Sequence, residues 1–243
     1  MGMAATQPVV QKTSVQRIFQ RQEKKYLLNR AQFDAIHDRL LSFMEPDRFG
    51  QSTVSSVYYD NDWHELIIKS IEKPIYKEKF RLRSYGVPNP DSPVFAEIKK
   101  KYNGVVYKRR VTAPYEEMNA FLAREKMLEK DVQIQKEILY MIDRYQLHPA
   151  LWLSYDRLAL SGRDDPQVRV TFDLHTRFRT YDLDLAAGDY GEPLRDDNFI
   201  IMETKVPGAA PLWLARLLSE MKIYPGSFSK YGTCYQEKIM TRK

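Results

Sequence analysis

The sequence alternates apolar and basic residues at Phe80-Arg81-Leu82-Arg83, and this pattern leads into a turn at Gly86. Residues i and i+2 of a strand point to the same face of a sheet. Arg81 and Arg83 would therefore share one face, and Phe80 and Leu82 would share the other. The stretch predicts a β-strand with one apolar face for a core and one strongly basic face.

The same pattern recurs on other stretches of the chain. Charged or polar residues occupy alternate positions at Glu23 and Lys25, Glu97 and Lys99, Lys108 and Arg110, Tyr155 and Arg157, Arg169, Thr171 and Asp173, and Glu203 and Lys205. On a single strand, such a face is usually solvated. Many strands whose faces hold mainly Arg, Lys and Glu, with few Ser, Thr, Asn or Gln, instead favour a groove or the lumen of a barrel.

Period-two alternation and helical periodicity divide the chain into elements. We predict strands over residues 20–28, 54–60, 76–86, 93–101, 104–112, 151–160, 167–174, 176–184 and 198–206. We predict helices over about 31–43, 62–70, 114–127, 131–145 and 211–221, and a last helix from Lys230. Asn103-Gly104 is a strong hairpin signal between two of the strands.

These elements predict an α+β fold. Its centre would be a closed antiparallel β-barrel of about eight strands, forming a tunnel, with helices packed outside and the C-terminal helix at one tunnel mouth. We expect a flexible leader over residues 1–16 and a single domain over residues 17–243.

Composition narrows the class of partner. The chain of 243 residues carries 38 Lys+Arg against 32 Asp+Glu, a net charge of +6 that favours an anionic ligand. Its single cysteine, Cys234, cannot form an internal disulfide, which fits a cytoplasmic protein. Its apolar runs are far shorter than the roughly 18 residues of a membrane span. We expect a soluble chain and leave open a membrane-associated partner.

Many like charges inside a barrel would repel one another, so a polyanion is the natural counterion. Arginine suits phosphate oxygens because its planar group donates two parallel hydrogen bonds, and lysine adds point charges. Carboxylates among these cations suggest a hard metal ion that bridges phosphates, either Mn²⁺ or Mg²⁺. The candidate ligands are Glu23, Glu97, Asp173 and Glu203, of which Glu203 is the strongest.

Several segments resemble one known family. They are Glu23-Lys24-Lys25-Tyr26, Ser56-Val57-Tyr58-Tyr59-Asp60, the stretch from Phe80 to Gly86, Phe95-Ala96-Glu97-Ile98-Lys99, Met202-Glu203-Thr204-Lys205 and Phe228-Ser229-Lys230-Tyr231. In this order they resemble the VTC domain, over roughly residues 17 to 238. That domain is the polyphosphate polymerase domain of the vacuolar transporter chaperone, within the triphosphate tunnel metalloenzyme superfamily. The resemblance implies a closed tunnel that uses ATP to extend inorganic polyphosphate.

The resemblance also implies roles for individual residues. Phosphate-gripping catalytic residues would be Lys25, Arg81, Arg83, Lys99, Arg157 and Arg169. Further substrate-binding residues would be Glu23, Glu97, Lys108, Arg110, Tyr155, Lys205, Ser229 and Lys230, and Glu203 would hold the metal. Related tunnel hydrolases open with Glu-x-Glu-x-Lys, whereas Arg21 stands at the first Glu position here. This departure favours the VTC branch.

Three alternatives remain at the level of sequence. A hydrolase of triphosphate or polyphosphate would use the same tunnel with water as the acceptor. A non-catalytic module would bind polyphosphate or inositol phosphates without turnover. Nucleic-acid binding would use the aromatic residues Tyr102, Tyr107 and Trp152, which lie near basic residues, but we expect these to be core or interface aromatics and expect no nucleic-acid partner.

Overall fold

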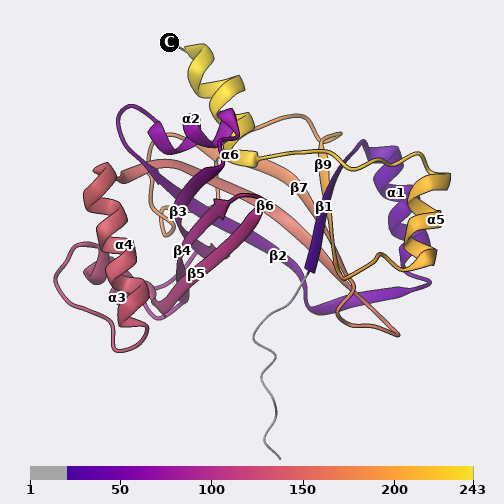
Figure 1. Ribbon diagram of the computed structural model, residues 1–243, viewed down its shortest axis with the longest axis horizontal. Helices are drawn as coiled ribbons and strands as arrows, with labels where there is room; N and C mark the ends of the chain where they lie inside the picture. Colours follow the sequence, from indigo (N-terminus) through magenta and orange to yellow (C-terminus); the bar gives the residue numbers. More distant parts are fainter. Residues whose placement is uncertain (1–20, 243) are drawn as a thin grey trace, which may run out of the picture.

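The computed structural model describes residues 21–242, which form a nine-stranded antiparallel sheet flanked by helices (Figure 1). The strands are β1 (Arg21–Leu28), β2 (Met44–Asp60), β3 (Tyr76–Tyr85), β4 (Pro93–Tyr102), β5 (Val105–Pro114), β6 (His148–Gly162), β7 (Arg169–Arg179), β8 (Glu192–Pro193) and β9 (Ile200–Pro207). Their order in the sheet is β1-β9-β7-β6-β2-β3-β4-β5, and β8 pairs with β7. The leader predicted over residues 1–16 lies outside the described residues.

Four helices cover the two ends of the sheet on its outside, and six α-helices are found within residues 21–242. They are α1 (Arg30–Leu40), α2 (Glu65–Glu72), α3 (Tyr115–Leu122), α4 (Val132–Tyr145), α5 (Leu212–Glu220) and α6 (Lys230–Cys234). One core joins α1 and α5 to β1, β7 and β9, and a second joins α3 and α4 to β3, β4 and β5. Figure 1 shows these two helix pairs at opposite ends of the molecule. The predicted packing of helices outside the sheet is confirmed for both pairs.

The sheet curves strongly, but it does not close. Its two outermost strands are β1 and β5, and no backbone pairing joins them within residues 21–242. We call the gap between them the seam. A side-chain ion pair crosses it, with Lys108 Nζ 2.9 Å from Glu23 Oε1. The predicted α+β antiparallel fold is therefore confirmed, whereas a closed barrel is not; eight strands form the continuous path, as expected, and the two-residue β8 pairs beside it.

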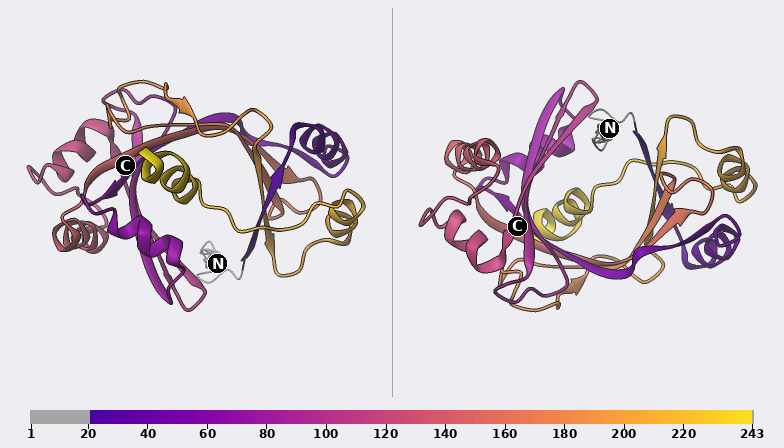
Figure 2. Two further views of the ribbon diagram at one scale, coloured as in Figure 1. Left: turned by 90° about the horizontal axis from the view of Figure 1, so that it is seen from above. Right: turned by 90° about the horizontal axis from the view of Figure 1, so that it is seen from below.

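The C-terminal segment lies inside the curve of the strands, as both views in Figure 2 show. Tyr231 of α6 is buried in a third core with Tyr58 of β2 and Tyr155 of β6. Its hydroxyl donates to the buried carboxylate of Asp60 at 2.9 Å, and the same carboxylate accepts the amide of Leu66 at the start of α2 at 2.9 Å. Asp60 thereby fixes both α2 and α6 against the end of β2.

Several predicted boundaries change for local reasons. The two strands predicted over 167–174 and 176–184 form one strand, β7, which bends at His175, where φ is 46°. The pairing register with β6 shifts at this bend, between Ser154 and Asp156. β2 begins ten residues before the predicted strand, at Met44. The hairpin at Asn103-Gly104 is confirmed, because both residues have positive φ, 44° and 83°, as a two-residue turn of this kind requires.

None of the helices found within residues 21–242 is both long and apolar enough to cross a lipid bilayer.

Candidate functional site: a charged inner face

The pairing register brings the sequence-predicted residues to one face of the sheet. Residues directly opposite each other in antiparallel strands share a face. The cross-strand pairs include Lys25 with Glu203, Glu23 with Lys205, Arg169 with Lys205, Arg157 with Asp173, Arg81 with Glu97, Glu97 with Arg110, and Lys99 with Lys108. We call this the inner face. The register of Lys108 and Arg110, the least certain from sequence, places them with Lys99 and Glu97.

One cluster on the inner face is built around Glu97 of β4. Arg81 Nε and Nη2 lie 2.8 Å and 2.7 Å from Glu97 Oε2, and Arg83 Nη1 lies 3.8 Å from the same oxygen. Arg81 Nη1 also donates a hydrogen bond to the Tyr58 hydroxyl oxygen at 3.0 Å. Burial alone would raise the pKa of Glu97, but Arg81 and Arg83 hold it below its usual range. The carboxylate therefore stays charged and fixes two arginines side by side.

A second cluster is built around Asp173 of β7. Arg157 binds this carboxylate with two hydrogen bonds of 2.7 Å and 2.9 Å, and Lys230 at the start of α6 also contacts it. The Asp173 side chain is only 2% exposed. Despite this burial, the two cations hold the pKa of Asp173 far below its usual range. Tyr155 packs beside them, with Lys230 Nζ 4.1 Å from its ring centre.

The lysines of the inner face have a different environment. Lys79, Lys99 and Lys108 stand directly opposite one another on β3, β4 and β5. Burial and neighbouring cations lower the pKa of Lys99 to about 8, and burial is also the main cause that lowers the pKa of Lys79 to about 8. Like charges directly opposite each other destabilise a sheet. This part of the inner face is therefore short of negative charge.

The segment before α6 runs along the inner side of β1. Gly226 donates its amide to the carbonyl of Lys25 at 2.7 Å, and Lys25 Nζ donates to the carbonyl of Phe228 at 3.0 Å. Lys79 Nζ lies 3.2 Å from Ser229 Oγ, which also accepts the amide of Gly232. Ser229 and Lys230, both predicted to bind phosphate, are thus held next to residues of β1, β3 and β7.

Glu203 is the carboxylate with the greatest freedom to hold a metal. Glu97 and Asp173 are held by two cations each, and Glu23 is bound by Lys108, whereas the Glu203 carboxylate lies 3.4 Å from a single lysine, Lys205. Residues 21–242 contain no cluster of three or more acidic, His or Cys ligands suited to a metal ion. Mg²⁺ is often held by one or two carboxylates together with substrate phosphates. The donor set fits a metal that arrives with its phosphate ligand.

Arg169 is placed somewhat apart from the two arginine clusters. It lies on the inner face at the start of β7, opposite Lys205, and pairs with Asp47 of β2.

Among the aromatic residues considered for nucleic-acid binding, Trp152 is buried in the core as expected, but Tyr102 and Tyr107 are exposed. Of the expected core or interface placement, the core is therefore wrong for these two tyrosines of the β4–β5 hairpin, and an interface role stays a prediction.

Sequence reasoning missed two contributors to this face, Lys79 and Tyr58, and the structural role of a third residue, Asp173. Lys79 continues the alternation of Arg81 and Arg83 by one more step, so the signal was present in the same strand. Tyr58 lies opposite Arg81 in the register of β2 and β3. Asp173 was considered only as a metal ligand, but its carboxylate is already held by Arg157 and Lys230.

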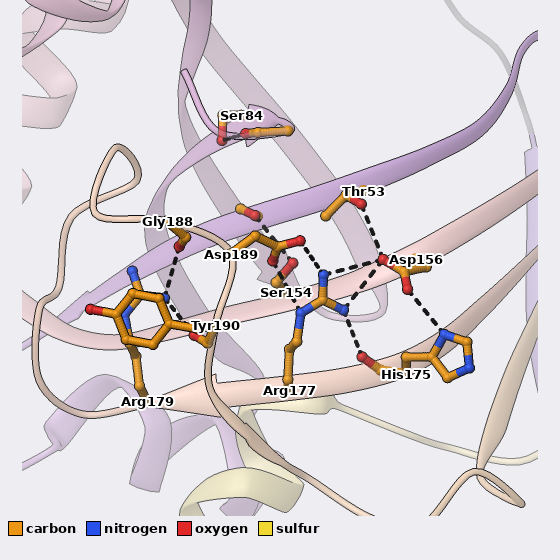
Figure 3. A network of polar contacts seen from close by, with 12 residues as sticks. Thr53, Ser84, Ser154, Asp156, His175, Arg177, Arg179, Gly188, Asp189 and Tyr190 are labelled. Carbon is orange, nitrogen blue, oxygen red and sulfur yellow. Dashed lines mark hydrogen bonds and ion pairs between the residues drawn. The ribbon is translucent and has the colours of Figure 1, made fainter. Parts of the chain in front are cut away.

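The opposite side of β6 and β7 carries a separate polar network, shown in Figure 3. Asp156 Oδ1 accepts from Thr53 Oγ1 at 3.1 Å and from Arg177 Nη2 at 3.2 Å, and its Oδ2 lies 3.0 Å from His175 Nδ1. Burial opposes a charged Asp156, yet these partners keep its pKa low. The network ties the bend at His175 to β2 and β6, which is a structural role.

Comparisons with known proteins show the family of this chain. The structure is that of a class of fold suited to binding anions, a curved antiparallel sheet with Arg and Lys side chains from most of its long strands on the inner face. The chain belongs to the VTC domain family, which it matches over residues 20–238. It is 27% identical over 228 residues to vacuolar transporter chaperone complex subunit 4 of Trypanosoma cruzi, and 28% identical over 229 residues to the same subunit of Trypanosoma brucei brucei. Both matches cover 74% of this chain.

The chain spans roughly a quarter of the length of these relatives, since the matches cover 27% and 28% of them. Solved structures are more distant. A Hippeastrum protein with a dominant triphosphatase activity is 14% identical with a TM-score of 0.49, and the likeness covers 89% of this chain and 95% of that one. A Pyrococcus horikoshii protein is 13% identical with a TM-score of 0.43, covering 91% of this chain and 100% of that one.

Proposed function

We propose that this chain is a metal-dependent polyphosphate polymerase that transfers the γ-phosphate of ATP to the end of a growing inorganic polyphosphate chain. The observation that carries the proposal is the pair of cation clusters around Glu97 of β4 and Asp173 of β7, which share the inner face of the curved sheet. Membership of the VTC domain family supports the same activity.

In this proposal, the arginines supply charge and position. Arg81 and Arg83 follow each other on one face of β3, and Arg157 lies on the same inner face on β6, so a triphosphate bound on this face would meet cations from both strands. Phosphoryl transfer needs this kind of positioning and charge neutralisation more than it needs a nucleophilic side chain. The acceptor would be the terminal phosphate of the chain, aligned by Lys25, Lys99 and Arg169.

Glu203 is the proposed ligand for Mn²⁺ or Mg²⁺. A divalent ion bound there would neutralise phosphate charge and orient the γ-phosphoryl group. Lys205 Nζ lies 3.4 Å from Glu203 Oε1 and would hold this carboxylate in place until the metal binds. Burial and the nearby Arg157 lower the pKa of Lys205.

The remaining substrate-binding assignments follow from placement. Lys108, Arg110, Tyr155, Ser229 and Lys230 lie around the two clusters and would extend the grip on phosphate. Glu23 and Glu97 would act indirectly, because each orients cations beside it.

We place the activity in the cytoplasm, within one domain, with ATP and polyphosphate as the small-molecule partners. Assembly into a larger complex is a further proposal, which rests on the names of the two trypanosome relatives, both complex subunits. Two other activities would use the same residues: hydrolysis of triphosphate or polyphosphate, and binding of polyphosphate or inositol phosphates without turnover.

Purified protein incubated with ATP and Mn²⁺ tests the proposal, with ADP, free phosphate and long-chain polyphosphate measured in the same reaction. We expect one ADP to be released for each phosphate unit added to polyphosphate. Arg83→Ala should form neither product. Arg109→Ala is the matched control, because Arg109 lies on the outer face with Glu137 at 2.8 Å. Free phosphate without polyphosphate would show that the chain is a hydrolase and not a polymerase. No turnover of ATP would show that it is a binding module.

A further inference from the structure

A set of inner-face lysines continues past the predicted site toward the β4–β5 hairpin. Lys77 and Lys101 stand directly opposite each other, one step beyond the pair Lys79 and Lys99. By register these residues share the face of Arg81 and Glu97, since they follow in steps of two along β3 and β4. We call Lys79, Lys99 and Lys108 the first lysine row, and Lys77 and Lys101 the second lysine row.

These rows lack the carboxylates that hold the arginines. Of the five lysines in the two rows, Lys108 forms an ion pair, with Glu23. Among residues 21–242, no carboxylate lies within ion-pair distance of the other four lysines. Lys79 and Lys77 donate instead to uncharged oxygens, at 3.2 Å to Ser229 Oγ and 2.8 Å to the carbonyl of Ser70. Repulsion acts in the second row as well, because the pKa of Lys77 is lowered by burial, by Lys101 and by Lys73.

A structure gains nothing from pairing lysine with lysine across strands, because like charges directly opposite each other are destabilising. The arrangement is understandable if an anion lies along both rows. The two rows are two residues apart along their strands, which corresponds to about 7 Å. Lys77 of the second row is four residues from Arg81 along β3, which corresponds to about 13 Å. An anion that contacts all three levels must be long and linear.

We propose that the second lysine row, Lys77 and Lys101, is an outer binding subsite that selects a long linear phosphate chain over a triphosphate. The inference rests on the proposed function and extends it, because it gives the chain a path from the arginine clusters out past the ends of β3 and β4 that lie beside the β4–β5 hairpin. Removing the two ammonium groups of this row weakens the binding of long polyphosphate. The same change leaves a triphosphate bound at the arginines with its full set of cations.

Calorimetric titration with tripolyphosphate and with long-chain polyphosphate tests this subsite. For Lys77→Gln/Lys101→Gln, we expect the affinity for long-chain polyphosphate to fall about tenfold, an effect typical of two charged groups. The affinity for tripolyphosphate should change less than twofold. The salt dependence of long-chain binding should also become shallower, because fewer counterions are displaced.

The matched control is Lys100→Gln. Lys100 lies between Lys99 and Lys101 but points to the outer face, 3.6 Å from Glu137. It should leave both affinities unchanged. Lys101→Glu is a second test variant, because Lys101 is exposed and its replacement leaves the core intact.

The outcomes separate the two proposals. If the wild type binds both ligands and the Lys77 and Lys101 variants lose no more long-chain affinity than Lys100→Gln, the outer subsite is wrong while the phosphate site stands. Equal losses for both ligands would also overturn the subsite. If the wild type binds neither ligand, both the proposed function and the subsite fail.

Discussion

The inner face has two parts that carry the same sign of charge but balance it differently. Arg81 and Arg83 are held by the partly buried carboxylate of Glu97, and Arg157 is held by the buried carboxylate of Asp173. Lys79 and Lys99 have no such partner within the described residues, and their pKa values fall to about 8, mainly because of burial. The difference indicates that the arginine part is positioned before any ligand binds, whereas the lysine part is completed by the ligand.

Removing the carboxylate of the arginine part should have the largest effect on stability. We expect Asp173→Asn to lower the free energy of unfolding by about 3–5 kcal/mol, because it leaves Arg157 and Lys230 without their buried partner. Chemical denaturation measures this loss. The control is Asp189→Asn on the outer face, where Arg177 keeps Asp156 as a partner, and the expected cost is under about 1 kcal/mol.

The same cluster predicts how stability responds to acid. The pKa of Asp173 is depressed in the folded protein, so its contribution is present above the unfolded pKa of about 3.9 and is lost as pH falls below that value. Asp173→Asn should lack this part of the acid transition. Equal stability of the variant and the wild type at neutral pH would contradict the role of Asp173.

The lysine part should make anion binding depend on pH. The ammonium forms of Lys79 and Lys99 dominate below about pH 8, and a bound anion favours them and raises their pKa. We therefore expect tripolyphosphate binding to take up protons between about pH 8 and 10 and to weaken about tenfold from pH 7 to pH 10. Calorimetry in buffers of different ionisation enthalpy measures the uptake.

Lys79→Arg is the matched variant for this pH effect. Arginine keeps its charge throughout this range, so the variant should bind with a flatter pH profile and a smaller proton uptake. A profile in the variant that is as steep as that of the wild type would show that Lys79 does not carry the effect.

Tyr58 sits where the two parts meet and should give the smallest effect. Burial opposes ionisation of its phenol, but Arg81, Arg83 and Lys79 lower its pKa to about 8. We expect an ultraviolet titration to reveal one tyrosine that ionises near pH 8 and that is missing in Tyr58→Phe. The substitution also removes the 3.0 Å contact to Arg81 and should cost about 1 kcal/mol of stability.

Alternation along each strand was enough to predict which residues share the inner face. It holds from Lys79 to Arg83 because the side-chain period of a strand is two, and the turn at Asn103-Gly104 fixes the register of β4 and β5. The family resemblance then assigned roles to residues that the structure places on this face.

Other features depend on contacts that a single sequence does not reveal. The bend at His175 puts a non-glycine residue at positive φ, which is supported by its contact with Asp156 from a neighbouring strand. The partners of Asp173 come from β6 and α6, which are distant in sequence. Closure of the barrel depends on how far the sheet curves, and that is set by bulges and packing rather than by any one strand.

Two arginines on opposite faces of the same sheet test directly whether the inner face binds the anion. Tripolyphosphate affinity is measured by calorimetry for Arg81→Gln, on the inner face, and for Arg109→Gln, on the outer face. We expect a loss of more than about tenfold for Arg81→Gln and less than about twofold for Arg109→Gln. Equal losses would mean that the anion responds only to net charge, and the inner face would not be its binding site.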